Sequence, residues 1–100
     1  MPIDQQDREF LQAAEAALAA AWDRYHDAKP ADQPLLYPQI ELAYQRWLEI
    51  RLRLLDPDPL SSAADVAEAR TLRKQIEQAA DQQALVIAVV RLVALLAKFA

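Results

Sequence analysis

The most constraining stretch of this sequence is residues 84–100, ALVIAVVRLVALLAKFA, whose only polar side chains are Arg91 and Lys98. Read as a helix, it carries two neighbouring apolar stripes that together wrap most of its circumference. Such a helix has to be buried against its own chain, a second copy, a partner or a bilayer. The positions that we expect to form an interface are Leu85, Val86, Val89, Val90, Leu92, Val93, Leu96 and Phe99.

The composition predicts an all-α fold in a single helical domain over residues 1–100. Glycine is absent, and most residues before Val86 are good helix formers such as alanine, leucine, glutamine and arginine. The valines of the last stretch also suit a strand, but no other segment offers a partner strand. One hundred residues give a core of modest size, so association with a second chain would add stability.

The first two predicted helices form an antiparallel hairpin. The first covers about residues 4–28, with Asp4 as its N-cap. The second covers about residues 38–55, because Pro38 suits a first helical turn and the Asp-Pro-Asp-Pro sequence at 56–59 prevents continuation.

Aromatic residues are placed as mirror images about the loop of this hairpin, as Trp22-x-x-Tyr25 and Tyr44-x-x-Trp47. In an antiparallel helix pair, the residue numbers of two side chains at the same level add to nearly the same total along the whole pair. This symmetry predicts that Trp22 lies level with Trp47 and Tyr25 level with Tyr44 in the core of the hairpin.

The third predicted helix covers about residues 62–100. Ser62 and Asp65 have the spacing of a capping box at its start. Neither glycine nor proline follows, so we expect one long helix with room for a kink at residues 81–83. The resulting fold is a hairpin plus a long C-terminal helix. The alternative is a break near Asp81, which would give a four-helix bundle.

The residues that carry catalytic or metal chemistry are few. The single histidine, His26, follows Asp23 by three residues, a spacing found in helical metal sites, but no second element of this kind completes a site. Cysteine is absent, Ser61 and Ser62 have the positions of caps, and a chain without glycine has no phosphate-binding loop. We therefore expect no enzyme activity, no catalytic residues, no cofactor and no metal.

The charge pattern bears on partners and location. The net charge is −4, and the basic residues near Trp47 and on the third helix alternate with acids, as on ordinary solvated helix faces. We therefore expect no nucleic-acid partner. The first ten residues lack the pattern of a secretory signal, and a cytoplasmic location is the expectation.

The function that these features favour is a non-enzymatic protein-interaction or oligomerisation module, such as an adaptor, a chaperone-like protein or an inhibitor of a larger complex. We expect a homodimer or higher homo-oligomer, with room for a different protein partner. The alternative is a peripheral membrane protein that uses residues 84–100. That segment would span about 26 Å as a helix, short of a hydrocarbon layer of about 30 Å, and Arg91 at its centre opposes insertion.

Overall fold

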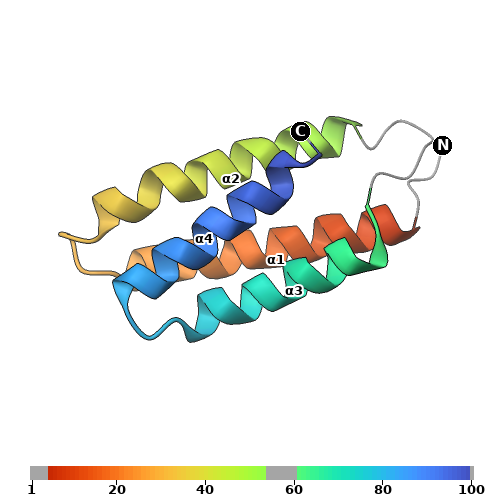
Figure 1. The fold of residues 1–100 in the computed structure, drawn as a ribbon. Helices are drawn as coiled ribbons and strands as arrows, with labels where there is room; N and C mark the ends of the chain where they lie inside the picture. Colours follow the sequence, from red (N-terminus) through yellow and green to blue (C-terminus); the bar gives the residue numbers. More distant parts are fainter. Residues whose placement is uncertain (1–4, 54–60, 100) are drawn as a thin grey trace.

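The structure, a computed structural model, describes residues 5–53 and 61–99, and four helices account for most of them. They are α1 (Gln5–Asp27), α2 (Gln33–Arg53), α3 (Ala63–Gln78) and α4 (Gln82–Ala97). α1 and α2 form one antiparallel hairpin, and α3 and α4 form a second (Figure 1). The all-α prediction is confirmed. The four helices fit the bundle alternative and not the hairpin with one long helix.

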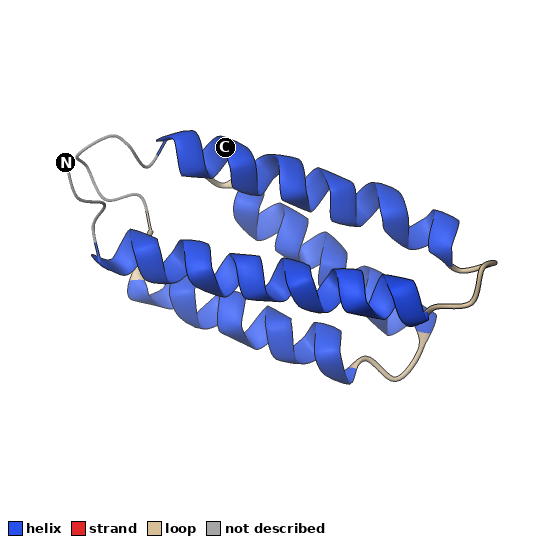
Figure 2. Cartoon of the chain, turned by 180° about the vertical axis from the view of Figure 1, so that it is seen from behind, coloured by secondary structure: helices blue, strands red, loops and turns tan. Residues whose placement is uncertain are grey.

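The two hairpins lie side by side in the same orientation. α1 packs mainly on α3, and α2 packs mainly on α4. The colours in Figure 1 show that the two helices of each such pair run in the same direction. α2 and α3 lie at opposite edges, with α4 in front of the space between them in Figure 1 and α1 in front of it in the reverse view of Figure 2. Within the described ranges, α2 and α3 make no contact.

The core combines small residues on α1 with larger side chains from the other three helices. Fully buried alanines such as Ala14 and Ala17 face inward from α1, and Ala69 of α3 is also fully buried. Small residues let two helix axes approach closely, which explains why the α1–α3 contact is the most extensive in the molecule. The largest fully buried apolar side chains are Leu36, Ile40, Ile76, Val89, Leu92 and Leu96.

The expectation of one long helix over residues 62–100 is wrong, because the chain leaves the helical conformation at Ala79. Its ψ angle of 123° is extended, and Asp81 then caps α4 by accepting a hydrogen bond from the Ala84 N–H at 2.8 Å. The break lets α4 fold back and bury Leu92 and Leu96. This burial outweighs the helical hydrogen bonds lost at the break, since each fully buried leucine contributes about 1.5–3 kcal/mol.

The expected start of the second helix near Pro38 is also wrong, because α2 begins at Gln33. The Lys29 carbonyl accepts hydrogen bonds from the N–H groups of Asp32 and Gln33 at 2.8 and 3.2 Å, which closes the turn after α1. Pro34 occupies the first turn of α2, where a missing N–H has no helical partner to lose. Pro38 therefore lies inside the helix.

The earlier start of α2 shifts the pairing of the hairpin by about three helical turns. Trp22 contacts Tyr37, with 5.9 Å between ring centroids, and the Trp47 indole N–H donates to the Leu11 carbonyl at 3.2 Å. The predicted levels of Trp22 with Trp47 and of Tyr25 with Tyr44 are therefore wrong. The aromatic symmetry in the sequence does not set the register of the hairpin, which depends on the length of the loop.

Because α1 runs parallel to α3 and α2 runs parallel to α4, the C-terminal ends of the two helices in each pair lie together. Positively charged side chains, which are favourable at C-terminal ends, are found there. At the C-terminal ends of α1 and α3, the Arg24 guanidinium donates to the carbonyls of Ile76, Glu77 and Ala79 at 3.1, 3.1 and 2.8 Å. At the corresponding ends of α2 and α4, Arg53 donates to the Phe99 carbonyl at 2.7 Å. Both arginines thus bind carbonyl groups that a helix end leaves unpaired.

Some predicted features lie outside the described residues. These are the Asp4 cap, the end of the second helix at residues 54–55, the stop at 56–59 and the last residue, Ala100.

Candidate interaction surfaces

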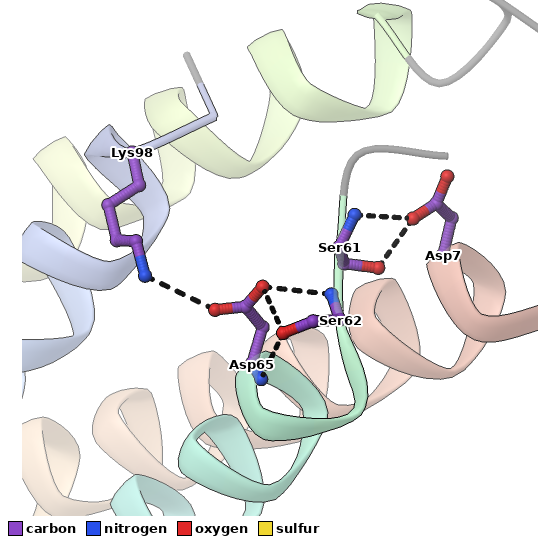
Figure 3. Close-up of polar contacts among 5 residues, drawn as sticks. All are labelled: Asp7, Ser61, Ser62, Asp65 and Lys98. Carbon is purple, nitrogen blue, oxygen red and sulfur yellow. Dashed lines mark hydrogen bonds and ion pairs between the residues drawn. The ribbon is translucent and has the colours of Figure 1, made fainter. Parts of the chain in front are cut away.

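A cluster of buried and capping polar side chains joins α1, α3 and the end of α4 (Figure 3). Asp7, in the first turn of α1, is buried and accepts hydrogen bonds from the Ser61 N–H, at 2.9 Å, and from the Ser61 hydroxyl. This contact places a carboxylate where the N-terminal ends of α1 and α3 meet. A negative charge is favourable at that position.

The predicted capping box at Ser62 and Asp65 is confirmed. The Asp65 N–H donates to the Ser62 hydroxyl oxygen at 3.2 Å, and the Ser62 N–H donates to the Asp65 carboxylate at 2.9 Å. The Lys98 ammonium, after the end of α4, lies 3.2 Å from the other carboxylate oxygen of Asp65. Burial raises the pKa of Asp65, but the Ser62 hydrogen bonds and Lys98 together hold it below the ordinary value of an aspartate.

Replacing Asp65 with asparagine is expected to lower the free energy of unfolding at neutral pH by about 1 kcal/mol, the typical value of a helix cap. Because the pKa of Asp65 is lower in the folded than in the unfolded state, its contribution is present above about pH 4 and is lost as the pH falls through the folded value. The difference between variant and parent should therefore shrink in urea titrations below pH 4. The exposed Asp23→Asn change is the control, and a difference that persists unchanged into acid would contradict this account.

The serines and the histidine occupy separate parts of the molecule. Both serine hydroxyls at the start of α3 bind carboxylates, an arrangement that completes helix ends. His26 lies at the other end of the bundle, stacked on Trp22 with 6.3 Å between ring centroids. Across residues 5–53 and 61–99, no group of three histidine, aspartate or glutamate side chains is placed to hold a metal ion.

The arginines of α2 are engaged within the chain. Arg46 forms an ion pair with Glu49 at 3.2 Å, and Arg51 lies over the Trp47 ring at 5.7 Å. Arg53 is bound to the end of α4. These contacts account for the basic side chains that lie near Trp47 in the sequence.

The eight predicted interface residues of the C-terminal segment divide into two groups. Five of them are buried in the core of the chain itself and are not accessible to a partner in this conformation: Leu85, Val89, Leu92, Leu96 and Phe99. Val86 and Val93 are half-buried at the edge of α4, and Val90 is exposed. In this conformation, only Val86, Val90 and Val93 of the eight predicted residues are at least partly accessible to a partner.

The outer face of α4 is apolar for most of its length. Ile87 and Val90 are 44% and 42% exposed, and Ala94 and Ala97 are also exposed on this face. α4 contains no acidic residue, and Arg91 is its one charged side chain. The exposure of Ile87 was not predicted, because residues on an all-round apolar helix cannot be assigned to inside or outside until the neighbouring helices are known.

Beside Ile87, an open groove of about 400 Å³ runs between the end of α3 and the start of α4. Its lining includes Gln75, Gln78, Ala84, Ile87, Ala88 and Arg91. The groove extends the outer face of α4 onto α3. An apolar side chain from another molecule would find aliphatic contacts there, with amide groups at the rim.

In the described part of the chain, no helix combines the length and the apolar character needed to cross a membrane. Insertion of residues 84–100 into a bilayer would also remove the buried side chains of α4, such as Leu92 and Leu96, from the core.

No family model, curated protein or solved structure matches this chain.

Proposed function

We propose that this protein is a helical interaction module that self-associates through the outer face of α4. The observation that carries the proposal is the exposure of Ile87 and Val90 on a helix with one charged side chain. Exposed apolar surface is typical of interaction sites once it exceeds a few hundred Å². The proposal keeps the predicted role of the C-terminal segment and limits it to the stripe that the core leaves free.

The size of this face indicates the strength of the association. α4 has 16 residues and is about 24 Å long, so a strip about 10 Å wide covers about 240 Å². Stable interfaces bury about 800 Å² on each partner. The groove beside Ile87 enlarges the face, because a two-fold pairing would let Ile87 or Val90 of one copy enter the groove of the other. We expect a weak dimer whose population depends on protein concentration.

Replacing Val90 with glutamate should abolish this dimer, because a charge buried in an apolar contact lacks a compensating partner. The unmodified protein should change from dimer towards monomer on dilution in sedimentation velocity, whereas Val90→Glu should sediment as a folded monomer throughout. Since Val90 is exposed, the variant should keep its helical circular dichroism.

The matched control is Leu52→Glu, the same kind of change at a leucine of α2 that is 71% exposed. This variant should associate like the unmodified protein. A parent protein that stays monomeric at every concentration would refute self-association, and equal effects of both glutamates would refute the assignment to α4.

A further inference from the structure

A second surface of distinct chemistry lies along the α1–α2 hairpin. Five of the seven aromatic residues of the chain follow this side of the hairpin, and we call them the aromatic seam: Trp22, Tyr25, Tyr37, Tyr44 and Trp47. Trp22 contacts both Tyr25 and Tyr37, with ring centroids 5.6 and 5.9 Å apart, and Tyr44 stacks on Trp47 at 6.2 Å. Tyr37 is 43% exposed, so the seam is open to solvent.

Two hollows lie along the aromatic seam. The first, of about 390 Å³, is lined by Tyr25, Pro30, Gln33, Pro34, Tyr37 and Pro38. The second, of about 360 Å³, has Glu15, Leu18, Trp22, Tyr44, Trp47 and Arg51 in its lining. Tyr37 and Tyr44, one from each hollow, are seven residues apart on α2, or about 10 Å along its axis. Both hollows present ring faces and aliphatic edges.

The polar side chains of the first hollow are two tyrosine hydroxyls, which can donate or accept, and the Gln33 amide. Among the described residues, the hydroxyls of Tyr25 and Tyr37 have no hydrogen-bond partner, while the Gln33 amide already donates to the Tyr25 carbonyl at 3.1 Å. No charged residue lines this hollow. A ligand that brings apolar rings and carbonyl acceptors therefore suits this hollow.

Two carboxylates and one guanidinium, that of Arg51, lie at or beside the second hollow, which leaves a net negative charge there. Glu15 lines it, and Glu41 follows Tyr37 by four residues, one turn along the same face of α2. Neither carboxylate has an ion-pair partner in the described ranges. Arg51 of the chain itself already lies over the Trp47 ring at 5.7 Å, which shows that a guanidinium fits against this aromatic face.

We propose that the aromatic seam binds a proline-rich segment of another protein in the polyproline II conformation, with a basic residue at one end. Such a segment offers proline rings to aromatic grooves, carbonyls that accept from tyrosine hydroxyls, and few backbone N–H groups. Three of its residues advance about 9 Å, close to the 10 Å between Tyr37 and Tyr44. The basic residue pairs with Glu15 and Glu41. This binding is independent of self-association through α4.

Tryptophan fluorescence is a direct readout, because both tryptophans of the chain belong to the aromatic seam. The probe is a synthetic peptide with prolines at every third position and one terminal arginine. We expect a saturable fluorescence change on titration, with affinity that falls as salt rises. Two control peptides, one with the prolines regrouped and one with glutamate in place of arginine, should bind at least about tenfold more weakly.

Variants of the protein locate the site. Tyr37→Ala should weaken binding of the probe about tenfold or more, Tyr37→Phe should weaken it by a smaller factor through loss of the hydroxyl, and Glu41→Gln should reduce the salt dependence. Arg70→Ala, at an exposed position on α3, should bind like the parent. Tyr37 is exposed, so circular dichroism should show all variants folded. Absence of a saturable change, unaltered binding by Tyr37→Ala, or equal binding of the glutamate peptide would each overturn the proposal.

Discussion

A Leu92→Ala variant is expected to unfold with a free energy about 2–5 kcal/mol lower than that of the unmodified protein, the range for removal of a buried leucine side chain. Leu92 is fully buried in the cluster that joins all four helices. Small domains have total stabilities of about 5–15 kcal/mol, so this loss is a large share of the whole. The melting temperature should fall by roughly 10 °C or more. Urea titration followed by circular dichroism measures the difference.

The control for this prediction is Leu52→Ala, the same chemical change at an exposed leucine, which should alter stability by less than about 0.5 kcal/mol. Equal unfolding midpoints for the two variants would contradict the packing of α4 into the core of its own chain. Such a result would return Leu92 to the intermolecular interface that the sequence first predicted.

An Arg24→Met variant should lose about 2–4 kcal/mol of stability. The Arg24 guanidinium donates to three carbonyls at the end of α3, and a hydrogen bond to a charged group contributes about 1.5–3 kcal/mol, with incomplete additivity among bonds from one group. Methionine keeps the apolar stem of the side chain and removes the donors. α3 has no basic residue of its own in its last turn, so nothing within the helix replaces the charge.

Two control variants separate the contribution of the Arg24 hydrogen bonds to stability from the effect of removing a positive charge. Arg8→Met makes the same substitution at an exposed position of α1 and should be nearly neutral. Arg24→Lys should fall between the parent and Arg24→Met, because an ammonium keeps the charge but lacks the planar fork that reaches several carbonyls. If Arg24→Met were as stable as Arg8→Met, the break at Ala79 would have to be maintained by other contacts.

The features of this fold that can be predicted from the sequence are those determined by residues close together in the chain. The extent of α1 and the capping box at Ser62 follow from periodicity and spacing over a few positions, and both agree with the structure over the described residues. Asp81 carried a local signal, since aspartate is a strong N-cap, but the helix formers around it favoured continuity. Arg24, which binds the carbonyls beside this break, lies 52 to 55 residues from them in the sequence.

The residues of the outer face of α4 and of the aromatic seam can be recognised in the sequence, but their exposure at the surface cannot be predicted from it. An apolar helix was evident, but which stripe remains exposed depends on where α2 and α3 pack. Likewise Trp22, Tyr25, Tyr44 and Trp47 were expected as partners within the hairpin core. The start of α2 at Gln33 shifts the register, brings Tyr37 against Trp22 and leaves Tyr37 and Tyr44 exposed. Both surfaces arise from long-range packing, which no local pattern encodes.

The hydrogen bonds that α1 makes to the ends of the parallel helix α3 have a consequence for folding. α3 receives its N-terminal carboxylate contact from Asp7 and its C-terminal cation from Arg24, both of which belong to α1. The second hairpin caps the start of α3 with its own Ser62 and Asp65, but by itself it lacks the groups that bind the Ser61 N–H and the carbonyls at the end of α3. It cannot separate from the first hairpin without leaving those backbone groups unpaired, so the two halves of the molecule are coupled into one cooperative unit of unfolding.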